Sequence, residues 1–177
     1  TTLENLLMEK RNLDDLTGLF HRRAGIKILQ ELLFLSDVTG KPISMALLDL
    51  DGIRFLNTSL GYSKVDSVLA DFAGLLKRYF LFSGYLIRYG EDSFLVVLIG
   101  STLEDLQREI QRIRDELLSQ DKPEIMPVTF STGYAFRAAG SAFQLNEFLG
   151  KLEESLGIKK YKRRNANLSQ DIRFLKN

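Results

Sequence analysis

The sequence contains no cysteine and a single histidine among its 177 residues. The lack of cysteine excludes a disulfide scaffold, a thiolate zinc site and a cysteine nucleophile, and it fits a cytoplasmic location. His21 is the only histidine, so it cannot belong to a multi-histidine metal site, and we expect it to be a polar residue at the start of a helix. A metal site in this chain would therefore rely on oxygen ligands.

An excess of one charge and a long apolar run are also missing. Lys and Arg number 24 and Asp and Glu number 23, which gives a formal net charge of +1. No overall field therefore favours nucleic acid or an anionic membrane as a partner. No apolar run is long enough to cross a membrane, and no signal peptide is visible. Because 45% of the residues are hydrophobic, we expect one soluble domain with one core.

A hairpin is predicted within residues 85–100, YLIRYGEDSFLVVLIG. Two apolar, β-prone runs, Tyr85–Tyr89 and Phe94–Ile99, are joined by the short turn Gly90–Glu91–Asp92. The second run is too uniformly apolar for a surface strand, so we expect it in the middle of a sheet that is covered on both faces. The two adjacent carboxylates at the tip are either an ordinary polar turn or part of a functional site.

The rest of the chain alternates helical patterns with strand patterns. Helices are predicted over residues 21–38, 52–60, 63–82, 102–120 and 143–157, and strands over 43–50 and 127–136. Thr102 and Asp105 resemble a capping pair, and Gly133 interrupts the alternation of the last strand. This order predicts an α+β fold, with a central, mostly antiparallel sheet of about five strands wrapped by helices.

The N-terminal residues 1–15 place leucines at helical spacing among charged residues. Such a helix is either the end of a coiled-coil stalk or a helix that lies on the domain. We assign residues 1–13 to an N-terminal helix or linker and residues 14–177 to the domain. The chain begins with Thr1 and not with methionine, which is compatible with a piece excised from a longer protein.

Carboxylates mark the end of the strand predicted over residues 43–50. Asp49 and Asp51 flank Leu50, and the alternation of a strand points both side chains the same way. If this strand end lies beside the hairpin tip, Asp49, Asp51 and Asp92 form a carboxylate cluster. Oxygen ligands of this kind favour Mg²⁺ or Mn²⁺, which often share their coordination shell with substrate phosphates. The pattern therefore suggests phosphoryl or nucleotidyl transfer.

Five segments together resemble the GGDEF domain, the catalytic domain of bacterial diguanylate cyclases. They are DDLTGLFHRR (Asp14–Arg23), LLDLDGIRFLNTSLGYSKVD (Leu47–Asp66), RYGEDSF (Arg88–Phe94), VTFSTGYA (Val128–Ala135) and KKYKRRN (Lys159–Asn165). The resemblance covers nearly all of the chain from residue 14 to residue 165. It implies a palm-like fold, GTP as the substrate, and two domains that face each other, each with one GTP, to make cyclic di-GMP.

The resemblance also implies a metal site for Mg²⁺ or Mn²⁺. Asp49, the backbone carbonyl of Leu50 and Asp92 match the metal ligands of the family. Asp92 matches a ligand that is also proposed to help activate the attacking hydroxyl, which makes it the candidate catalytic residue.

Five further residues match the family positions that contact the nucleotide. Asn57 and Asp66 match the pair that reads the guanine edge, Arg54 replaces the usual lysine near the phosphates, and Lys160 and Arg164 match two C-terminal phosphate contacts. Each has an ordinary structural alternative. Asn57 suits a helix C-terminus and Asp66 a helix N-terminus, and the basic run suits a solvated helix end.

The signature itself departs from the family pattern, because it reads Gly90–Glu91–Asp92–Ser93–Phe94. Glu91 replaces the second glycine, where it adds bulk and negative charge beside the expected triphosphate. One like-charge contact at about 5 Å costs roughly 3 kcal/mol at an effective dielectric constant of about 20, or about two decades in affinity. Ser93 replaces the acidic fourth residue and removes a carboxylate that would help to hold the metal.

A second departure lies upstream of the signature. Leu81 and Gly84 occupy the positions where the RxxD inhibitory motif of the family often stands. We therefore expect a degenerate, catalytically silent or nearly silent domain. It would act as a regulatory or dimerisation module of a cyclic di-GMP signalling protein, as a homodimer or with a partner domain, and bind GTP. The alternatives are an active or weakly active diguanylate cyclase and a purely structural module with an occluded pocket.

Overall fold

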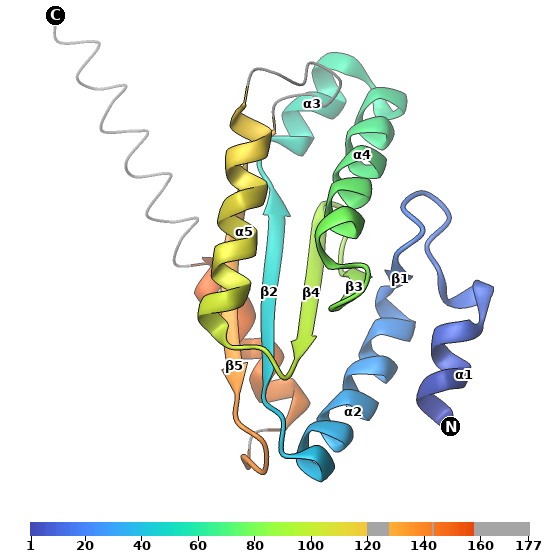
Figure 1. Ribbon diagram of the computed structural model, residues 1–177. Coiled ribbons are helices and arrows are strands. Elements are labelled where there is room, and N and C mark those ends of the chain that lie inside the picture. Colours follow the sequence, from blue (N-terminus) through green and yellow to red (C-terminus); the bar gives the residue numbers. More distant parts are fainter. Residues whose placement is uncertain (120–127, 143, 158–177) are drawn as a thin grey trace, which may run out of the picture.

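The computed structural model describes residues 1–119, 128–142 and 144–157. Its elements are α1 (Thr2–Met8), η1 (Lys10–Asn12), β1 (Phe20–His21), α2 (Arg22–Thr39), β2 (Ile43–Leu50), α3 (Ile53–Leu60), α4 (Tyr62–Phe80), β3 (Tyr85–Arg88), β4 (Ser93–Ile99), α5 (Leu103–Leu118), β5 (Phe130–Arg137) and a helix over residues 145–157 (Figure 1). Within these ranges, none of the helices combines the length and the apolar character that a membrane span requires.

The strands form one five-stranded sheet in the order β1-β3-β4-β2-β5. Only β1 and β3 pair in parallel, and the other three pairs are antiparallel. The predicted α+β fold with a mostly antiparallel sheet is therefore confirmed. The central strand β4 is buried from Phe94 to Leu98, as its uniform apolar run predicted. Strand β1 was missed because two residues are too few to produce a periodic pattern.

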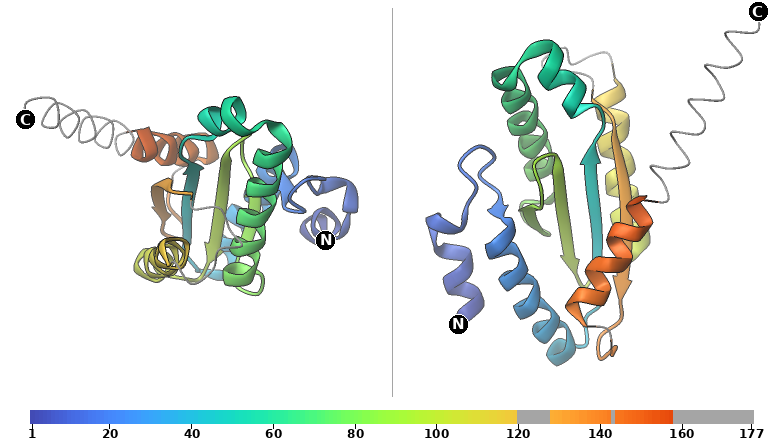
Figure 2. Two further views of the ribbon diagram at one scale, coloured as in Figure 1. Left: turned by 90° about the horizontal axis from the view of Figure 1, so that it is seen from above. Right: turned by 180° about the vertical axis from the view of Figure 1, so that it is seen from behind.

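Helices cover both faces of the sheet (Figure 2). Helices α4 and α5 pack on one face, and α2 and the helix over residues 145–157 pack on the other. Neighbouring residues of β2 alternate between the two cores, since Met45 faces one and Ala46 the other. The predicted buried stripe of α4 is confirmed at every position: Val65, Leu69, Phe72, Leu76 and Phe80.

Two helix starts confirm the sequence prediction. The Nδ1 atom of His21 accepts a hydrogen bond from the Ala24 backbone N–H at 3.1 Å, so His21 caps α2. The Thr102 hydroxyl accepts one from the Asp105 N–H at 3.1 Å and caps α5. Helix α4 is shorter than predicted, because it ends at Phe80 and not at residue 82.

The N-terminal helix is also shorter than predicted. It ends at Met8 because Glu9 has an extended backbone (φ −78°, ψ 114°), and a single 3₁₀ turn follows. Leu3, Leu6 and Leu7 pack against the core that α2 helps to form. Of the two alternatives for this segment, the structure has the helix that lies on the domain.

Gly133 lacks a side chain within β5 for a reason that lies outside the strand. A Cβ atom at this position would lie 2.5 Å from the carbonyl oxygen of Leu152 and 2.7 Å from the amide nitrogen of Leu156. The helix over residues 145–157 thus crosses β5 with its backbone against Gly133. The pairing with β2 continues in register through this residue.

Candidate functional site

The C-terminal end of β2 lies against the turn between β3 and β4. The backbone N–H of Leu50 donates a hydrogen bond to the carbonyl of Asp92 at 2.9 Å. Asp49 and Ser93 are partners across the β2–β4 ladder. Asp49 is 7% exposed, and Asp92 is half-buried. The structure therefore places the end of β2 beside the turn that carries Asp92.

The turn of residues 90–92 closes tightly. The N–H groups of Tyr89 and Gly90 both donate to the Ser93 carbonyl, at 2.9 and 3.2 Å. A Cβ atom at Gly90 would lie 2.5 Å from the Ser93 hydroxyl, so a larger residue here would require the Ser93 side chain to rotate away. Among the described residues only glycines have a positive φ. Glu91 therefore replaces a glycine without backbone strain, and it is exposed.

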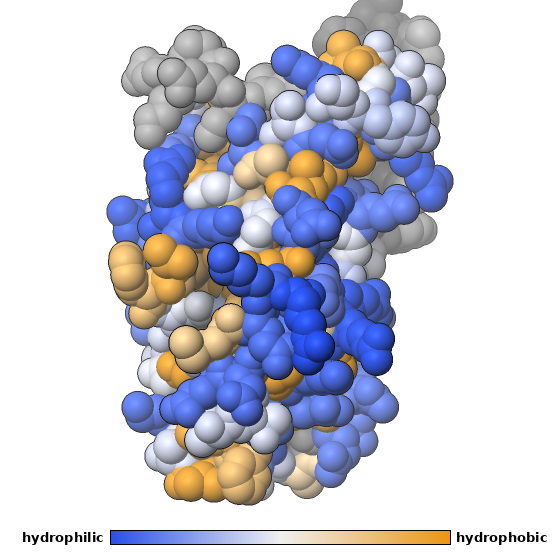
Figure 3. Space-filling model, turned by 90° about the vertical axis from the view of Figure 1, so that its right-hand side faces the viewer, coloured by the Kyte–Doolittle hydropathy of each residue, from blue (hydrophilic) through white to orange (hydrophobic). Residues whose placement is uncertain are grey.

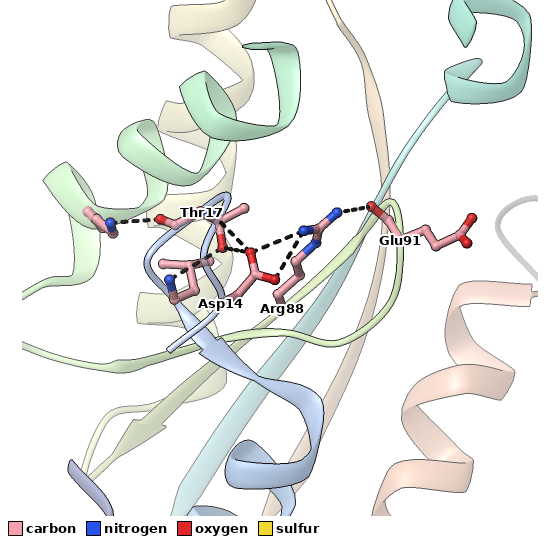
Figure 4. A network of polar contacts seen from close by, with 6 residues as sticks. Asp14, Thr17, Arg88 and Glu91 are labelled. Carbon is pink, nitrogen blue, oxygen red and sulfur yellow. Dashed lines mark hydrogen bonds and ion pairs between the residues drawn. The ribbon is translucent and has the colours of Figure 1, made fainter. Parts of the chain in front are cut away.

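Arg88 connects this turn to the segment before α2 (Figure 4). Its Nη1 atom donates to both carboxylate oxygens of Asp14, at 3.2 and 3.0 Å, and its Nη2 atom donates to the Glu91 carbonyl at 3.1 Å. Asp14 also accepts hydrogen bonds from the backbone and the hydroxyl of Thr17, at 2.9 and 2.7 Å. Figure 4 shows the Glu91 side chain extending away from this network, so only its carbonyl takes part.

The electrostatics of this network favour the ionised form of Asp14. Burial opposes ionisation, but the hydrogen bonds from Thr17 and Arg88 outweigh it, so the pKa of Asp14 is lowered from its ordinary value. Lys77 completes the network by donating to the Thr17 carbonyl at 2.8 Å. The segment of Asp14 and Thr17 is thus held to the turn on one side and to α4 on the other.

Tyr89 ties the turn to two helices. Its hydroxyl donates to Glu153 at 2.7 Å, and the guanidinium of Arg22 lies 4.2 Å from the centre of its ring. Arg22 also donates to the Tyr89 carbonyl at 3.3 Å. Burial raises the pKa of Tyr89 to about 12, and the hydrogen bond to Glu153 acts in the same direction. The ring therefore stays neutral at physiological pH.

Sequence reasoning gave no role to Arg88, Tyr89, Arg22 or Glu153. Their contacts join residues 64 to 74 positions apart in the chain. A local pattern carries no information on such pairs. The one available signal was that Arg88 and Tyr89 immediately precede the signature turn.

The predicted cluster of three carboxylates was wrong. The carboxylate of Asp51 accepts hydrogen bonds from the hydroxyls of Thr129 at 2.8 Å and Ser131 at 3.0 Å. The Asp51 carboxylate is thus held against β5 and against Thr129, which directly precedes this strand. Throughout the part of the chain that the structure describes, no three His, Asp or Glu side chains are grouped closely enough to hold a metal ion. Asp49 and Asp92 remain the two candidate carboxylate ligands.

The oxygen atoms at the end of β2 fit Mg²⁺ or Mn²⁺. Asp49 and Asp92 offer carboxylates, Leu50 offers a backbone carbonyl, and the hydrogen bond from Leu50 to Asp92 holds the two segments side by side. Mg²⁺ is usually bound by one or two carboxylates together with water and substrate phosphates. This donor set therefore suits an ion that arrives with a nucleotide better than a permanently bound ion.

The predicted nucleotide residues lie on the two helices that follow β2. Arg54 and Asn57 are three residues apart on α3 and so lie on neighbouring positions of one face, and Asp66 lies near the start of α4. Helices α3 and α4 contact each other. The Oδ1 atom of Asn57 is buried and accepts no hydrogen bond from the described residues, whereas Arg54 and Asp66 are exposed. Lys160 and Arg164 lie outside the described residues.

Comparison with known proteins gives one consistent family. The family model "Diguanylate cyclase, GGDEF domain" matches residues 11–166. The response regulator PleD of Caulobacter vibrioides is 30% identical over 158 residues, which are 86% of this chain and 35% of PleD. Diguanylate cyclase DosC of Escherichia coli is 27% identical over 114 residues, which are 64% of this chain and 25% of DosC. The chain thus spans about a third or less of these relatives.

Solved structures show the same fold. The FimX GGDEF domain from Pseudomonas aeruginosa superposes with a TM-score of 0.77 at 23% identity, covering 85% of this chain and 94% of that one. The diguanylate cyclase SiaD, solved with its activator SiaC from the same organism, gives a TM-score of 0.78 at 25% identity, covering 91% and 62%. The matched family model, the sheet order and the position of the signature turn at the end of β2 lead to one conclusion: this chain belongs to the GGDEF domain family of diguanylate cyclases.

Proposed function

We propose that this chain is a degenerate GGDEF domain of a bacterial cyclic di-GMP signalling protein. It binds GTP with Mg²⁺ or Mn²⁺ without measurable conversion to cyclic di-GMP, and it acts as a regulatory or dimerisation module. The observation that carries the proposal is the composition of the site. A buried acceptor that suits guanine supports binding, and the lack of any group of three metal-binding side chains among the described residues supports weak catalysis.

GTP binding is supported by the buried Oδ1 atom of Asn57, which accepts no hydrogen bond within the part of the chain that the structure describes. A buried acceptor without a donor costs free energy, and a ligand that supplies the donor recovers that energy. Guanine carries N–H donors on its Watson–Crick edge, and the exposed carboxylate of Asp66 can accept a second one. An adenine base presents a different pattern of donors, so the pair favours GTP over ATP.

Slow or absent catalysis is supported by the metal position. When bound, a divalent ion would neutralise the charge that develops on the transferred phosphate. Asp49 and Asp92 would hold it together with the Leu50 carbonyl, while Ser93 offers no carboxylate. Asp92 would contact the attacking hydroxyl and is therefore the candidate catalytic residue. Glu91 places an additional negative charge beside the phosphates, which weakens binding further.

A second candidate function, a weakly active diguanylate cyclase, is favoured by the geometry of the turn. Glu91 has an ordinary backbone conformation, its side chain is exposed, and the turn keeps its hydrogen bond to Leu50. An exposed carboxylate is screened by water and by salt, so its effect on the triphosphate is smaller than that of a buried one. On this view the remaining ligands suffice for turnover.

One experiment separates the two candidates. The chain is incubated at high concentration with GTP and Mg²⁺ or Mn²⁺, and the nucleotides are separated by chromatography. If the domain is inactive, the GTP stays unchanged. If the wild type produces cyclic di-GMP, and the Glu91→Gly/Ser93→Glu variant produces it faster, the weak cyclase is established instead. A variant Asp92→Asn controls for a contaminating enzyme, because it removes both the metal ligand and the candidate catalytic group.

GTP binding is tested separately by calorimetry. We expect GTP to bind in the presence of Mg²⁺, ATP to bind more weakly, and Asn57→Ala to reduce the affinity for GTP about tenfold. Asn146→Ala, which removes an exposed amide from the helix over residues 145–157, is the matched control. The absence of any heat with millimolar GTP would refute GTP binding. Unchanged affinity in Asn57→Ala would show that the base is read elsewhere.

A further inference from the structure

A cavity of ≈ 490 Å³ lies between the N-terminal segment and α2, on residues that take no part in the site at the end of β2. Its walls come from α1, from η1 and from the first turns of α2. The face of the molecule that carries α1 is dominated by hydrophilic side chains (Figure 3). The volume falls within the range of cavities that bind small molecules.

The cavity carries an excess of positive charge. Three cationic side chains line it, Arg11, Arg23 and Lys27, against the single carboxylate of Glu9. Glu9 is paired with Arg11, whose Nε atom lies 2.6 Å from the Glu9 carboxylate. Arg23 and Lys27 make no ion pair or hydrogen bond through their side chains to the residues that the structure describes. Their spacing of four residues places both on one face of α2.

Neutral donors complete the lining. His21 uses its Nδ1 atom to accept from the Ala24 N–H, so the neutral ring carries its hydrogen on Nε2, which is then a donor. Asn5 and Asn12 add side-chain amides, and Asn12 is fixed by its hydrogen bond to the Leu6 carbonyl at 2.9 Å. Two cations without partners and several N–H donors are the groups that recognise phosphate.

We propose that this cavity binds a phosphate dianion, either inorganic phosphate or the phosphate group of a small monoester. The dianion matches the two positive charges of Arg23 and Lys27. Because α1 forms one wall and α2 the other, the bound anion holds the N-terminal helix against the domain. The site is separate from the nucleotide residues on α3 and α4, and the proposal does not depend on the proposed function.

The proposal is tested on the full 177-residue chain by calorimetry and by NMR titration with inorganic phosphate and with adenosine monophosphate. We expect binding of at least one of the two in the millimolar range or tighter, with chemical-shift changes confined to α1, η1 and the start of α2. Binding of both identifies the phosphate group as the recognised part, and binding of the monoester alone identifies an organic phosphate as the ligand. Asn57→Ala leaves this binding unchanged, which separates it from GTP binding.

The variant Arg23→Ala/Lys27→Ala is expected to weaken phosphate binding by at least about tenfold, since each lost cation removes a charge-assisted hydrogen bond. Both side chains are exposed, so the variant folds, as a thermal melt will confirm. Lys41→Ala/Arg108→Ala removes the same charge elsewhere and is the matched control. The proposal is overturned if neither probe binds, if the cavity variant keeps the wild-type affinity, or if the control loses as much.

Discussion

Two Arg–Asp pairs sit at opposite ends of the sheet and use their guanidinium groups differently. At one end Arg137 makes a two-pronged pair with Asp37, at 2.7 and 3.1 Å, and donates to the Ser141 carbonyl at 2.8 Å. At the other end Arg88 places one nitrogen on both oxygens of Asp14 and keeps the other for the Glu91 carbonyl. The first pair is joined to the loop that follows β5, and the second is joined to the signature turn.

Burial separates the two arginines but not their partners, since Asp37 is 41% exposed and Asp14 is 21% exposed. The side chain of Arg137 is 4% exposed, whereas that of Arg88 is 18% exposed. A buried guanidinium that loses its partners destabilises the fold, while a partly exposed one is compensated by water. The comparison indicates that the Arg137 pair serves stability, and that the Arg88 pair sets the shape of the turn that presents Asp92.

The largest effect on stability is expected from Arg137→Met. The variant loses both bonds to Asp37 and the bond to Ser141, so the free energy of unfolding falls by about 2–3 kcal/mol. Urea denaturation measures this value. Arg108→Met, which breaks the exposed pair with Asp105, should cost less than about 1 kcal/mol. Equal costs in the two variants would mean that burial does not distinguish the pairs.

Arg88→Met should cost less stability but more function. We expect a loss of about 1–2 kcal/mol in the free energy of unfolding, together with weaker binding of GTP and Mg²⁺, because the Glu91 carbonyl loses its donor. Calorimetry at a temperature where the variant is folded measures the affinity. Arg137→Met is the control and should bind GTP normally. If both variants bind equally well, Arg88 does not shape the turn.

Glu91→Gly should raise the affinity for GTP with Mg²⁺. Glu91 is exposed, so screening reduces the repulsion to about 1 kcal/mol, which corresponds to roughly a fivefold change in Kd and not to two decades. Glu91→Gln keeps the bulk and removes the charge. If Glu91→Gly raises the affinity for GTP and Glu91→Gln does not, the effect comes from the bulk of the side chain. If neither variant raises the affinity, the Glu91 carboxylate lies too far from the triphosphate to repel it.

The smallest effect is the pH dependence of Asp14. Its pKa is lowered in the folded state from the ordinary value of about 3.9, so its contribution to stability is present above that value and is lost as the pH falls through the folded pKa. We expect Asp14→Asn to be less stable at pH 7 by about 0.5–1 kcal/mol, and the difference from the wild type to shrink below about pH 4. Urea denaturation at both pH values measures it, and a difference that stays constant would contradict the assignment.

The sequence alone was sufficient for the architecture around β2 and β4. The predicted bounds of β2 are those of the structure, and the apolar run of β4 predicted the central strand. Burial of a strand on both faces leaves so strong a pattern that no tertiary information is needed. The placement of Asp49 and Leu50 beside Asp92 followed from the strand ends and is confirmed by the hydrogen bond between Leu50 and Asp92.

Predictions that depended on side-chain orientation at the site succeeded less often. Asp51 was expected beside Asp92, but the hydroxyls of Thr129 and Ser131 hold its carboxylate against β5. The segment of residues 1–15 has helical spacing throughout, yet the helix ends at Met8, where Glu9 becomes extended. At Asp51 several local conformations have similar free energies, and the distant partners Thr129 and Ser131 select one of them.

The sequence by itself determined the longer helices and strands, the central strand and the residue types available for a metal and a nucleotide. It did so because periodicity and ligand chemistry are local properties of the chain. Only the tertiary structure decided that Arg88 joins Asp14 to the Glu91 carbonyl, that Gly133 admits the backbone of the last described helix, and that Arg23 and Lys27 face a cavity. Each of these contacts joins separate elements, and their approach depends on how the whole core packs.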